Sequence, residues 1–178
     1  EHDRLRRYRD GGGSYEGVIR GLRILEEAGI LEPRLNAEVL LAHATQHDRV
    51  WLFAHAGDEL IELWWIHYGR YLNERLEGKP TQYITGRQEF YGRDFRVGPE
   101  VLIPRPETEL LVEIVAGRSP ASIVDVGTGS GCIALALAKK LPAAQITAID
   151  ASAEALELNL DNVVNVFLLE RMEDDCFI

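Results

Sequence analysis

Asp125-Val126-Gly127-Thr128-Gly129-Ser130-Gly131 is a glycine-rich turn between an apolar segment and a helical one. Glycines in alternation permit positive φ angles and remove Cβ atoms, so a ligand can lie directly against the backbone. The helix that follows begins with unpaired N–H groups and the positive end of its dipole. The turn therefore predicts a binding site for a carboxylate or a phosphate.

The segments around this turn follow the order strand, turn, helix, strand, helix. Strands are predicted at residues 122–126 and 145–149, and helices at 132–141 and after Ser152, whose side chain can cap the last helix. A βαβα unit implies a parallel sheet covered by helices. Asp150 ends the second strand, and in this topology a carboxylate at that position binds ribose hydroxyls.

Two classes of ligand fit the turn. Residues 129–134, Gly-Ser-Gly-Cys-Ile-Ala, match a variant of the dinucleotide fingerprint, which would make the segment half of an NAD-type dehydrogenase. The alternation from Gly127, with Asp125 ahead of it, favours S-adenosylmethionine (SAM): loop N–H groups suit its carboxylate, an acid suits its ammonium, and Asp150 suits its ribose. A turn that only packs a helix on a strand is the remaining alternative. The predicted cofactor-binding residues are Asp125, Gly127, Thr128, Gly129, Ser130, Gly131 and Asp150.

The first half of the chain has a different pattern of apolar residues, typical of helices. Apolar side chains recur at helical spacing over residues 14–79 and predict a small helical bundle. Pro33 opens the second helix, Asp48 caps a short third helix that ends at Gly57, and the fourth is expected from about residue 58 to 77.

A hairpin is predicted between the two halves. Residues 82–85 have β-forming composition, and strands at 88–91 and 94–97 flank Gly92-Arg93, a two-residue loop that suits a type II′ turn. Pro106 fits the first turn of a further helix. The predicted organisation is a flexible arm at 1–13, a helical domain at 14–79, a hairpin linker at 80–104 and a partial cofactor-binding domain at 105–178.

Composition excludes several classes of protein. The 178 residues carry a net charge of −10, which disfavours non-specific nucleic-acid binding and leaves room for a protein partner with basic patches. No apolar run is long enough to span a membrane, and the charged N-terminus is no signal peptide.

Two isolated cysteines are expected to be free thiols in the cytoplasm. We predict no metal site, although His43 and His47 have i, i+4 spacing, and assign no catalytic residue because no nucleophile–base pair is visible.

Three ordered motifs carry a family resemblance. They are Tyr83–Gly92, Val101–Glu109, which contains Pro104-Arg105-Pro106-Glu107-Thr108, and the turn at 125–131. Together they resemble the HemK (PrmC) type of methyltransferase over roughly residues 14–159. The resemblance implies an α/β fold: an N-terminal helical bundle, a β-hairpin linker, and the start of a Rossmann-like SAM-dependent domain.

The resemblance also implies an activity. Members transfer a methyl group from SAM to the side-chain amide nitrogen (N5) of the glutamine in the Gly-Gly-Gln motif of peptide chain release factors, and their helical domain helps to recognise that partner. Pro104–Thr108 would lie near the mouth of the site, with Arg105 and Glu107 either functional or a structural ion pair.

The same resemblance places the catalytic motif outside this sequence. The family's Asn-Pro-Pro-Tyr motif, which orients the amide nitrogen, does not occur in the 178 residues, and residues 160–178 depart from the family pattern. We therefore expect a chain truncated before that motif and inactive by itself. A binding module that contacts SAM or a release factor without catalysis is the alternative.

Overall fold

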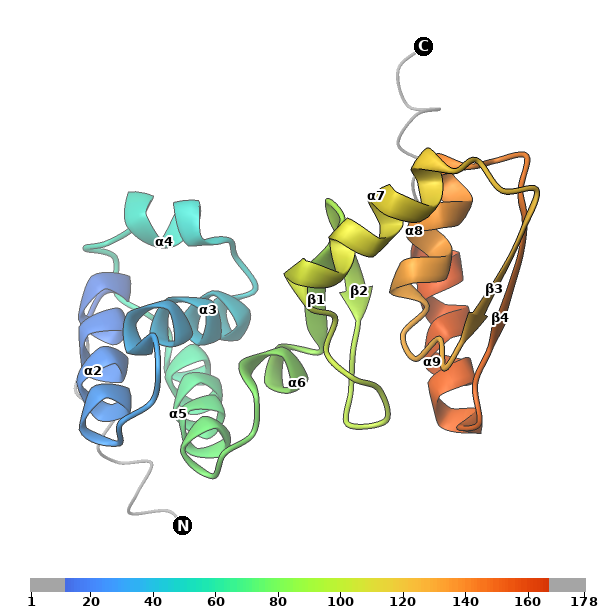
Figure 1. Cartoon of the computed structure of the whole chain (residues 1–178). Helices are drawn as coiled ribbons and strands as arrows, with labels where there is room; N and C mark the ends of the chain where they lie inside the picture. Colours follow the sequence, from blue (N-terminus) through green and yellow to red (C-terminus); the bar gives the residue numbers. More distant parts are fainter. Residues whose placement is uncertain (1–11, 167–178) are drawn as a thin grey trace. The chain divides into compact units, whose positions relative to one another are not determined.

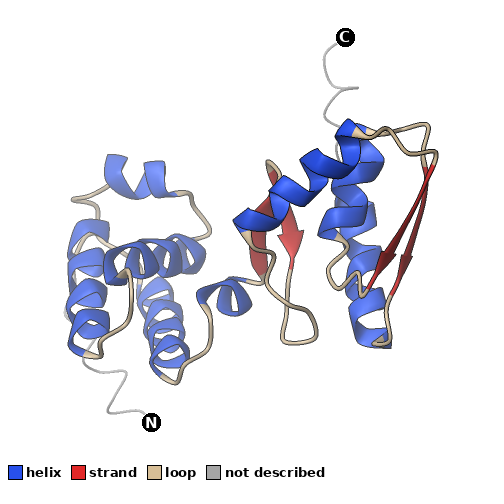
Figure 2. Cartoon of the chain, in the orientation of Figure 1, coloured by secondary structure: helices blue, strands red, loops and turns tan. Residues whose placement is uncertain are grey.

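The computed structural model describes residues 12–166 and divides into two compact units between Thr85 and Gly86 (Figures 1 and 2). This division falls within the range 80–104 that was expected to link two domains; the exact domain boundaries stay a prediction. The first unit is helical and the second combines short strands with helices. The predicted fold class, a helical region followed by the start of an α/β domain, is confirmed.

Among residues 12–85, the first unit contains five helices. They are α2 (Ser14–Glu27), α3 (Pro33–Thr45), α4 (Arg49–Ala54), α5 (Glu62–Leu76) and α6 (Thr81–Thr85). The core lies where α3 packs against α2 and α5, and its fully buried side chains include Leu25, Leu40, Leu41, Tyr68 and Leu72. Trp65 is buried in this core, and Trp51 and Trp64 pack against it. The bundle therefore buries an apolar core from its own helices.

A local signal sets the start of α4, and tertiary contacts move the start of α5. The Asp48 carboxylate accepts a hydrogen bond from the Trp51 N–H at 2.7 Å, so the predicted cap of α4 is confirmed. The helix ends at Ala54, before the predicted stop at Gly57. The fourth helix begins at Glu62, later than expected, because the segment before it is extended: Leu60 donates to the Gly12 carbonyl at 3.2 Å.

The prediction of β structure at residues 82–85 is wrong, because these residues form α6. The Pro80 carbonyl accepts hydrogen bonds from the N–H groups of Tyr83 and Ile84, at 3.0 and 3.1 Å, which closes a helical turn. Ile84 is buried in the core of the first unit, and the Thr81 hydroxyl donates to the Asn36 side chain. Burial against α3 and α5 overrides the weak local β preference.

The second unit begins with an antiparallel hairpin of β1 (Arg87–Phe90) and β2 (Arg93–Arg96). Phe90 pairs with Arg93, so the loop is Tyr91-Gly92 and not the predicted Gly92-Arg93. Both loop residues have positive φ, 55° and 72°, as in a type I′ turn and not type II′. Tyr91 is held there because its N–H donates to Glu109 at 2.9 Å and its hydroxyl donates to Glu113.

The rest of the second unit is the predicted strand–helix alternation. A 3₁₀ turn (η2, Pro106–Thr108) leads into α7 (Glu109–Gly117), followed by β3 (Ser122–Val126), α8 (Cys132–Lys140), β4 (Gln145–Ile149) and α9 (Ala153–Val164). The strands are parallel, with Val126 opposite Ile149 at their carboxyl ends. Phe90 and Phe95 of the hairpin share one core with Val112 and Leu137.

Helices cover one face of the β3–β4 pair (Figure 1). Ile123 and Ile146 point into the core beneath these helices. On the other face, Val124, Val126 and Ile149 are 62%, 74% and 46% exposed. Such an apolar strand surface is normally buried by further layers in parallel sheets.

Candidate cofactor site

The glycine turn folds around the carboxyl end of β4. Gly127 and Thr128 donate their N–H groups to the Ile149 carbonyl at 2.8 and 3.1 Å, and Gly131 donates to the Thr128 carbonyl at 2.9 Å. All three glycines of the turn have positive φ, at 74°, 54° and 79°. The backbone of the turn therefore has a conformation that residues with a side chain adopt only with strain.

Asp150 is brought directly against this turn. Its carboxylate accepts hydrogen bonds from the N–H of Gly129 at 2.8 Å and from the N–H of Ser152 at 3.0 Å. Donation from Ser152 and Gly129 holds the pKa of Asp150 below its ordinary value, so the group is ionised at neutral pH. A carboxylate has about four lone-pair sites, so capacity for ribose hydroxyls remains.

Asp125 lies on the other side of the turn, near the end of β3. Its half-buried carboxylate accepts a hydrogen bond from the hydroxyl of Thr128 at 2.8 Å. Thr128 and Ser130 are themselves buried, so their side chains belong to the scaffold of the turn. Two carboxylates therefore flank one glycine turn at the carboxyl edge of parallel strands, which is where ligands bind in open α/β sheets.

The space around the turn fits a ligand that approaches the backbone. A Cβ atom at Gly127 would meet nothing within 4 Å, and one at Gly129 would meet only Val101, at 3.9 Å. Gly131 differs, because a Cβ there would lie 2.5 Å from the Asn159 side chain. Gly131 is thus required by packing, while Gly127 and Gly129 present open backbone beside acidic groups. The open backbone and the two acids fit SAM, with Asp125 suited to its ammonium and Asp150 to its ribose.

Sequence reasoning missed Asn162 of α9. This side chain is fully buried and donates to the Ser130 carbonyl at 2.9 Å and to the Arg96 carbonyl at 3.0 Å, while it accepts from the Arg96 N–H at 2.7 Å. It thereby ties the turn to strand β2. A signal was available: Asn159 and Asn162 stand three residues apart inside a helix, where asparagine is unfavourable unless its amide has partners.

Val101, which lies three residues before the segment Pro104–Thr108, is 3.9 Å from the position that a Cβ atom at Gly129 would occupy. Arg105 and Glu107 are both exposed, and among residues 12–166 no ion pair joins these two side chains. Their alternative assignment as a structural ion pair is therefore not supported. Glu109, in contrast, has a structural role as the acceptor that holds Tyr91.

The remaining candidate groups do not form a further site within the described residues. Burial raises the pKa of the Cys132 thiol, which is free and stays protonated; Cys176 lies outside the described residues. Within residues 12–166, no group of three or more His, Cys, Asp or Glu side chains is placed to hold a metal ion. No helix in the same range has the length and apolarity needed to cross a membrane.

Comparison with known proteins adds two domain matches. Residues 18–86 match the model of the PrmC N-terminal domain, and residues 106–172 match the methyltransferase small domain. The second match contains the glycine turn and Asp150.

Three similar curated proteins are named release factor glutamine methyltransferase. The protein from Koribacter versatilis is 48% identical over 149 residues, which cover 82% of this chain and 53% of that protein. The proteins from Chlorobaculum tepidum and Neisseria gonorrhoeae are 46% and 42% identical, over 74% and 75% of this chain and 48% and 50% of theirs. The chain thus spans about half the length of the curated relatives it matches.

Proposed function

This chain belongs to the PrmC family of release factor glutamine methyltransferases, and from that membership we propose that it carries the SAM-binding part of such an enzyme. The proposed substrate is the glutamine of the Gly-Gly-Gln motif in a peptide chain release factor, methylated on its side-chain amide nitrogen (N5), in the cytoplasm. Names of relatives at 40–48% identity support the substrate class.

One observation carries the cofactor assignment: the N–H of Gly129 and the carboxylate of Asp150 meet at 2.8 Å, in a turn flanked by a second carboxylate. Gly127–Gly131 would receive the amino-acid end of SAM, with Asp125 near its ammonium, and Asp150 would accept hydrogen bonds from the ribose. When bound, SAM supplies a methyl group on a positively charged sulfur. The turn and the two carboxylates of this chain bind and orient that donor.

No residue of this chain is assigned to the transfer step. An amide nitrogen is a weak nucleophile and depends on groups that aim it at the methyl group. The family assigns that task to an Asn-Pro-Pro-Tyr motif, which these 178 residues do not contain. We therefore expect the 178-residue chain to bind SAM without methylating a release factor. The outcome to measure is a methyl group on the glutamine, by mass spectrometry of a release factor incubated with SAM; its appearance would show that the motif is dispensable.

Substitution of Gly129 tests the cofactor site. Gly129→Val should abolish binding of S-adenosylhomocysteine in calorimetry, because the side chain would occupy the space that the ligand needs beside the backbone. Gly86→Val is the matched control: Gly86 also has positive φ, 72°, and open space around it, and it lies in the same unit but outside the turn. The control therefore carries a similar backbone strain and should retain binding.

Three results would count against the assignment. Equal binding by wild type and Gly129→Val would remove the turn from the site. Loss of binding in both variants would attribute the effect to strain in the unit. Tighter binding of NAD than of S-adenosylhomocysteine by the wild type would favour the dinucleotide interpretation.

A further inference from the structure

Helix α9 holds one peptide group of the glycine turn, the group between Ser130 and Gly131, through two side chains. The Nδ2 of Asn162 donates a hydrogen bond to the Ser130 carbonyl at 2.9 Å. The amide of Asn159 packs against Gly131, because a Cβ atom at Gly131 would lie 2.5, 2.7 and 2.9 Å from its Oδ1, Cγ and Nδ2. Both asparagine side chains are buried.

Asn159 does not stabilise α9 by itself. Its side chain is 7% exposed, and within residues 12–166 it has no hydrogen-bond partner. An asparagine inside a helix is less favourable than an alanine, and a buried amide without a partner adds a further cost in free energy. The side chain does, however, fill the space against Gly131, which the smaller alanine would leave open.

The orientation of the Ser130–Gly131 peptide decides whether the turn closes. Its N–H belongs to Gly131 and donates to the Thr128 carbonyl at 2.9 Å, while its carbonyl accepts from Asn162. Reversal of the peptide plane would bring the Ser130 oxygen against the Thr128 oxygen and open the turn. Glycine populates positive and negative φ about equally, so Gly131 by itself does not prevent this reversal. A restraint from outside the turn is therefore needed.

We infer that Asn162 and Asn159 are positioning residues of the cofactor site: they fix the Ser130–Gly131 peptide and so keep the turn in the conformation that receives the ligand. Neither side chain is assigned a contact with the ligand. The inference rests on the proposed function, because it concerns the affinity of the turn for SAM. It extends that function to a helix outside the turn.

Calorimetry on the full chain, with S-adenosylhomocysteine as the probe, tests the inference. Asn159→Ala should weaken binding by about fivefold or more and change the free energy of unfolding little, because it removes an amide that has no partner. Asn162→Ala should weaken binding at least as much, at a temperature where circular dichroism shows a folded variant. Asn165→Ala, at the C-cap of α9, is the control and should leave the dissociation constant unchanged.

A double variant distinguishes a positioning role from a structural one. Gly131→Ala should weaken binding, because the added Cβ meets the Asn159 amide and because φ at this residue is 79°. Asn159→Ala in the same chain removes that amide. The double variant should therefore bind the ligand more tightly than Gly131→Ala does, although each single substitution weakens binding. Losses that simply add would overturn the contact as the source of the effect.

Amide exchange measured by NMR without ligand gives an independent readout. Asn159→Ala and Asn162→Ala should each accelerate exchange of the Gly131 N–H, by about tenfold relative to the N–H of a reference glycine in the same turn. Gly127 is that reference, because its N–H donates to Ile149 of β4 and not to the peptide held by α9.

The outcomes separate this inference from the proposed function. An unchanged exchange ratio in both variants, or an unchanged affinity of either, would overturn the positioning role. Absence of binding by the wild type would refute the proposed function, and the exchange ratio would then decide by itself whether α9 fixes the peptide.

Discussion

Asp150 combines a predicted role in ligand binding with a structural role in the turn. It is a predicted ribose acceptor, and it also holds the turn through the N–H groups of Gly129 and Ser152. We expect Asp150→Ala to weaken S-adenosylhomocysteine by about tenfold to a hundredfold, the range for lost hydrogen bonds to a charged group. Asp150→Asn should weaken it less, because the amide oxygen can still accept one N–H.

Calorimetry on these variants checks the prediction. Glu157→Ala, an exposed substitution on α9, is the control and should leave the dissociation constant unchanged. If Asp150→Ala binds the ligand as tightly as the wild type does, Asp150 is a structural residue of the turn and not part of the site.

Glu38 should make the stability of the first unit depend on pH. Burial raises the pKa of its carboxyl, but hydrogen bonds from Arg34 and Arg49 outweigh burial, so the folded-state pKa is lowered from the ordinary value of 4.5. The unfolded chain then binds this proton more readily than the folded one. The stabilisation is complete above the ordinary value and is lost as the pH falls through the lower folded value.

Urea unfolding at neutral and acidic pH measures this effect. All three tryptophans lie in the first unit, so their fluorescence reports its unfolding. Glu38→Gln should lower the free energy of unfolding at pH 7 by about 2 kcal/mol, the scale of a hydrogen bond to a charged group, and should flatten its decline in acid. Glu27→Gln, at an exposed position on α2, should do neither. An equal acid response in wild type and Glu38→Gln would assign the effect to other carboxyl groups.

At the scale of elements, helix α9 connects the hairpin to the glycine turn through hydrogen bonds of Asn162. Within residues 12–166, the Asn162 side chain makes three hydrogen bonds, all to backbone groups: two to Arg96 and one to Ser130. Asn162→Ala would leave these buried groups without partners. We expect it to lower the free energy of unfolding of the second unit by about 2–3 kcal/mol.

Hydrogen exchange at the Arg96 amide and chemical denaturation followed by circular dichroism can measure this loss. Asn165→Ala is the matched control, because Asn165 follows the same helix and is half-buried. Equal stability of the two variants would mean that water replaces the Asn162 amide without cost. The hydrogen bonds of Asn162 would then contribute nothing to the stability of the second unit.

At the scale of the whole molecule, the two units differ in how completely they bury apolar surface. The first unit surrounds its core with its own helices, whereas one face of the β3–β4 pair exposes Val124, Val126 and Ile149. We expect strong protection from hydrogen exchange in the core of the first unit and weaker protection in β3 and β4. The free energy of exchange should be smaller in the strands because local opening exposes little additional apolar area.

Hydrogen-exchange mass spectrometry on the 178-residue chain tests this difference. A dilution series is the control, because association through the open sheet face would raise protection as the concentration rises. Protection in β3 and β4 equal to that in α3 and α5, in a monomer, would contradict the argument.

The sequence by itself determined local features of this protein, each of which depends on residues only a few positions apart. Asp48 and Ser152 cap helices as predicted, and the two strands around the glycine turn have the predicted bounds. Apolar spacing, capping side chains and glycines act over one or two turns of chain, so their effects can be inferred without coordinates. The family motifs are likewise contiguous in the sequence, and the comparisons confirm the family.

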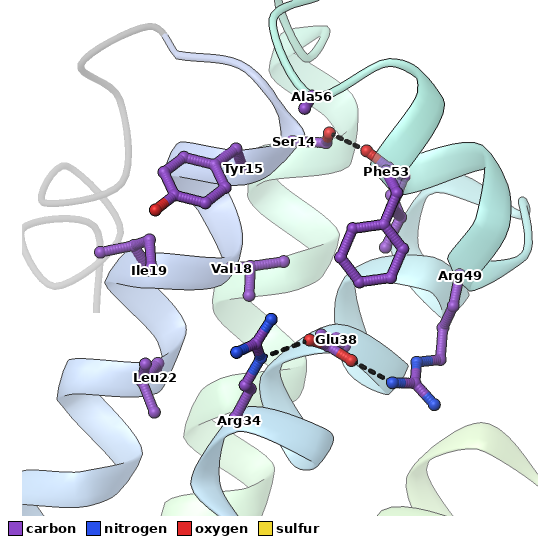
Figure 3. Close-up of a pocket in the computed structure, with 11 residues that line it drawn as sticks. Ser14, Tyr15, Val18, Ile19, Leu22, Arg34, Glu38, Arg49, Phe53 and Ala56 are labelled. Carbon is purple, nitrogen blue, oxygen red and sulfur yellow. Dashed lines mark hydrogen bonds and ion pairs between the residues drawn. The ribbon is translucent and has the colours of Figure 1, made fainter.

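Only the tertiary structure decided features that join residues far apart in the chain. Packing against α3 makes residues 81–85 a helix, contacts of Tyr91 with Glu109 and Glu113 accompany a shifted hairpin loop, and Asn162 reaches Ser130 across 32 positions. The ion pair between Glu38 and Arg49 likewise requires α3 and α4 side by side (Figure 3). The physical reason is that weak local preferences yield to burial and hydrogen bonding between residues far apart in the chain. The sequence pattern around one residue does not show which distant residue it will contact.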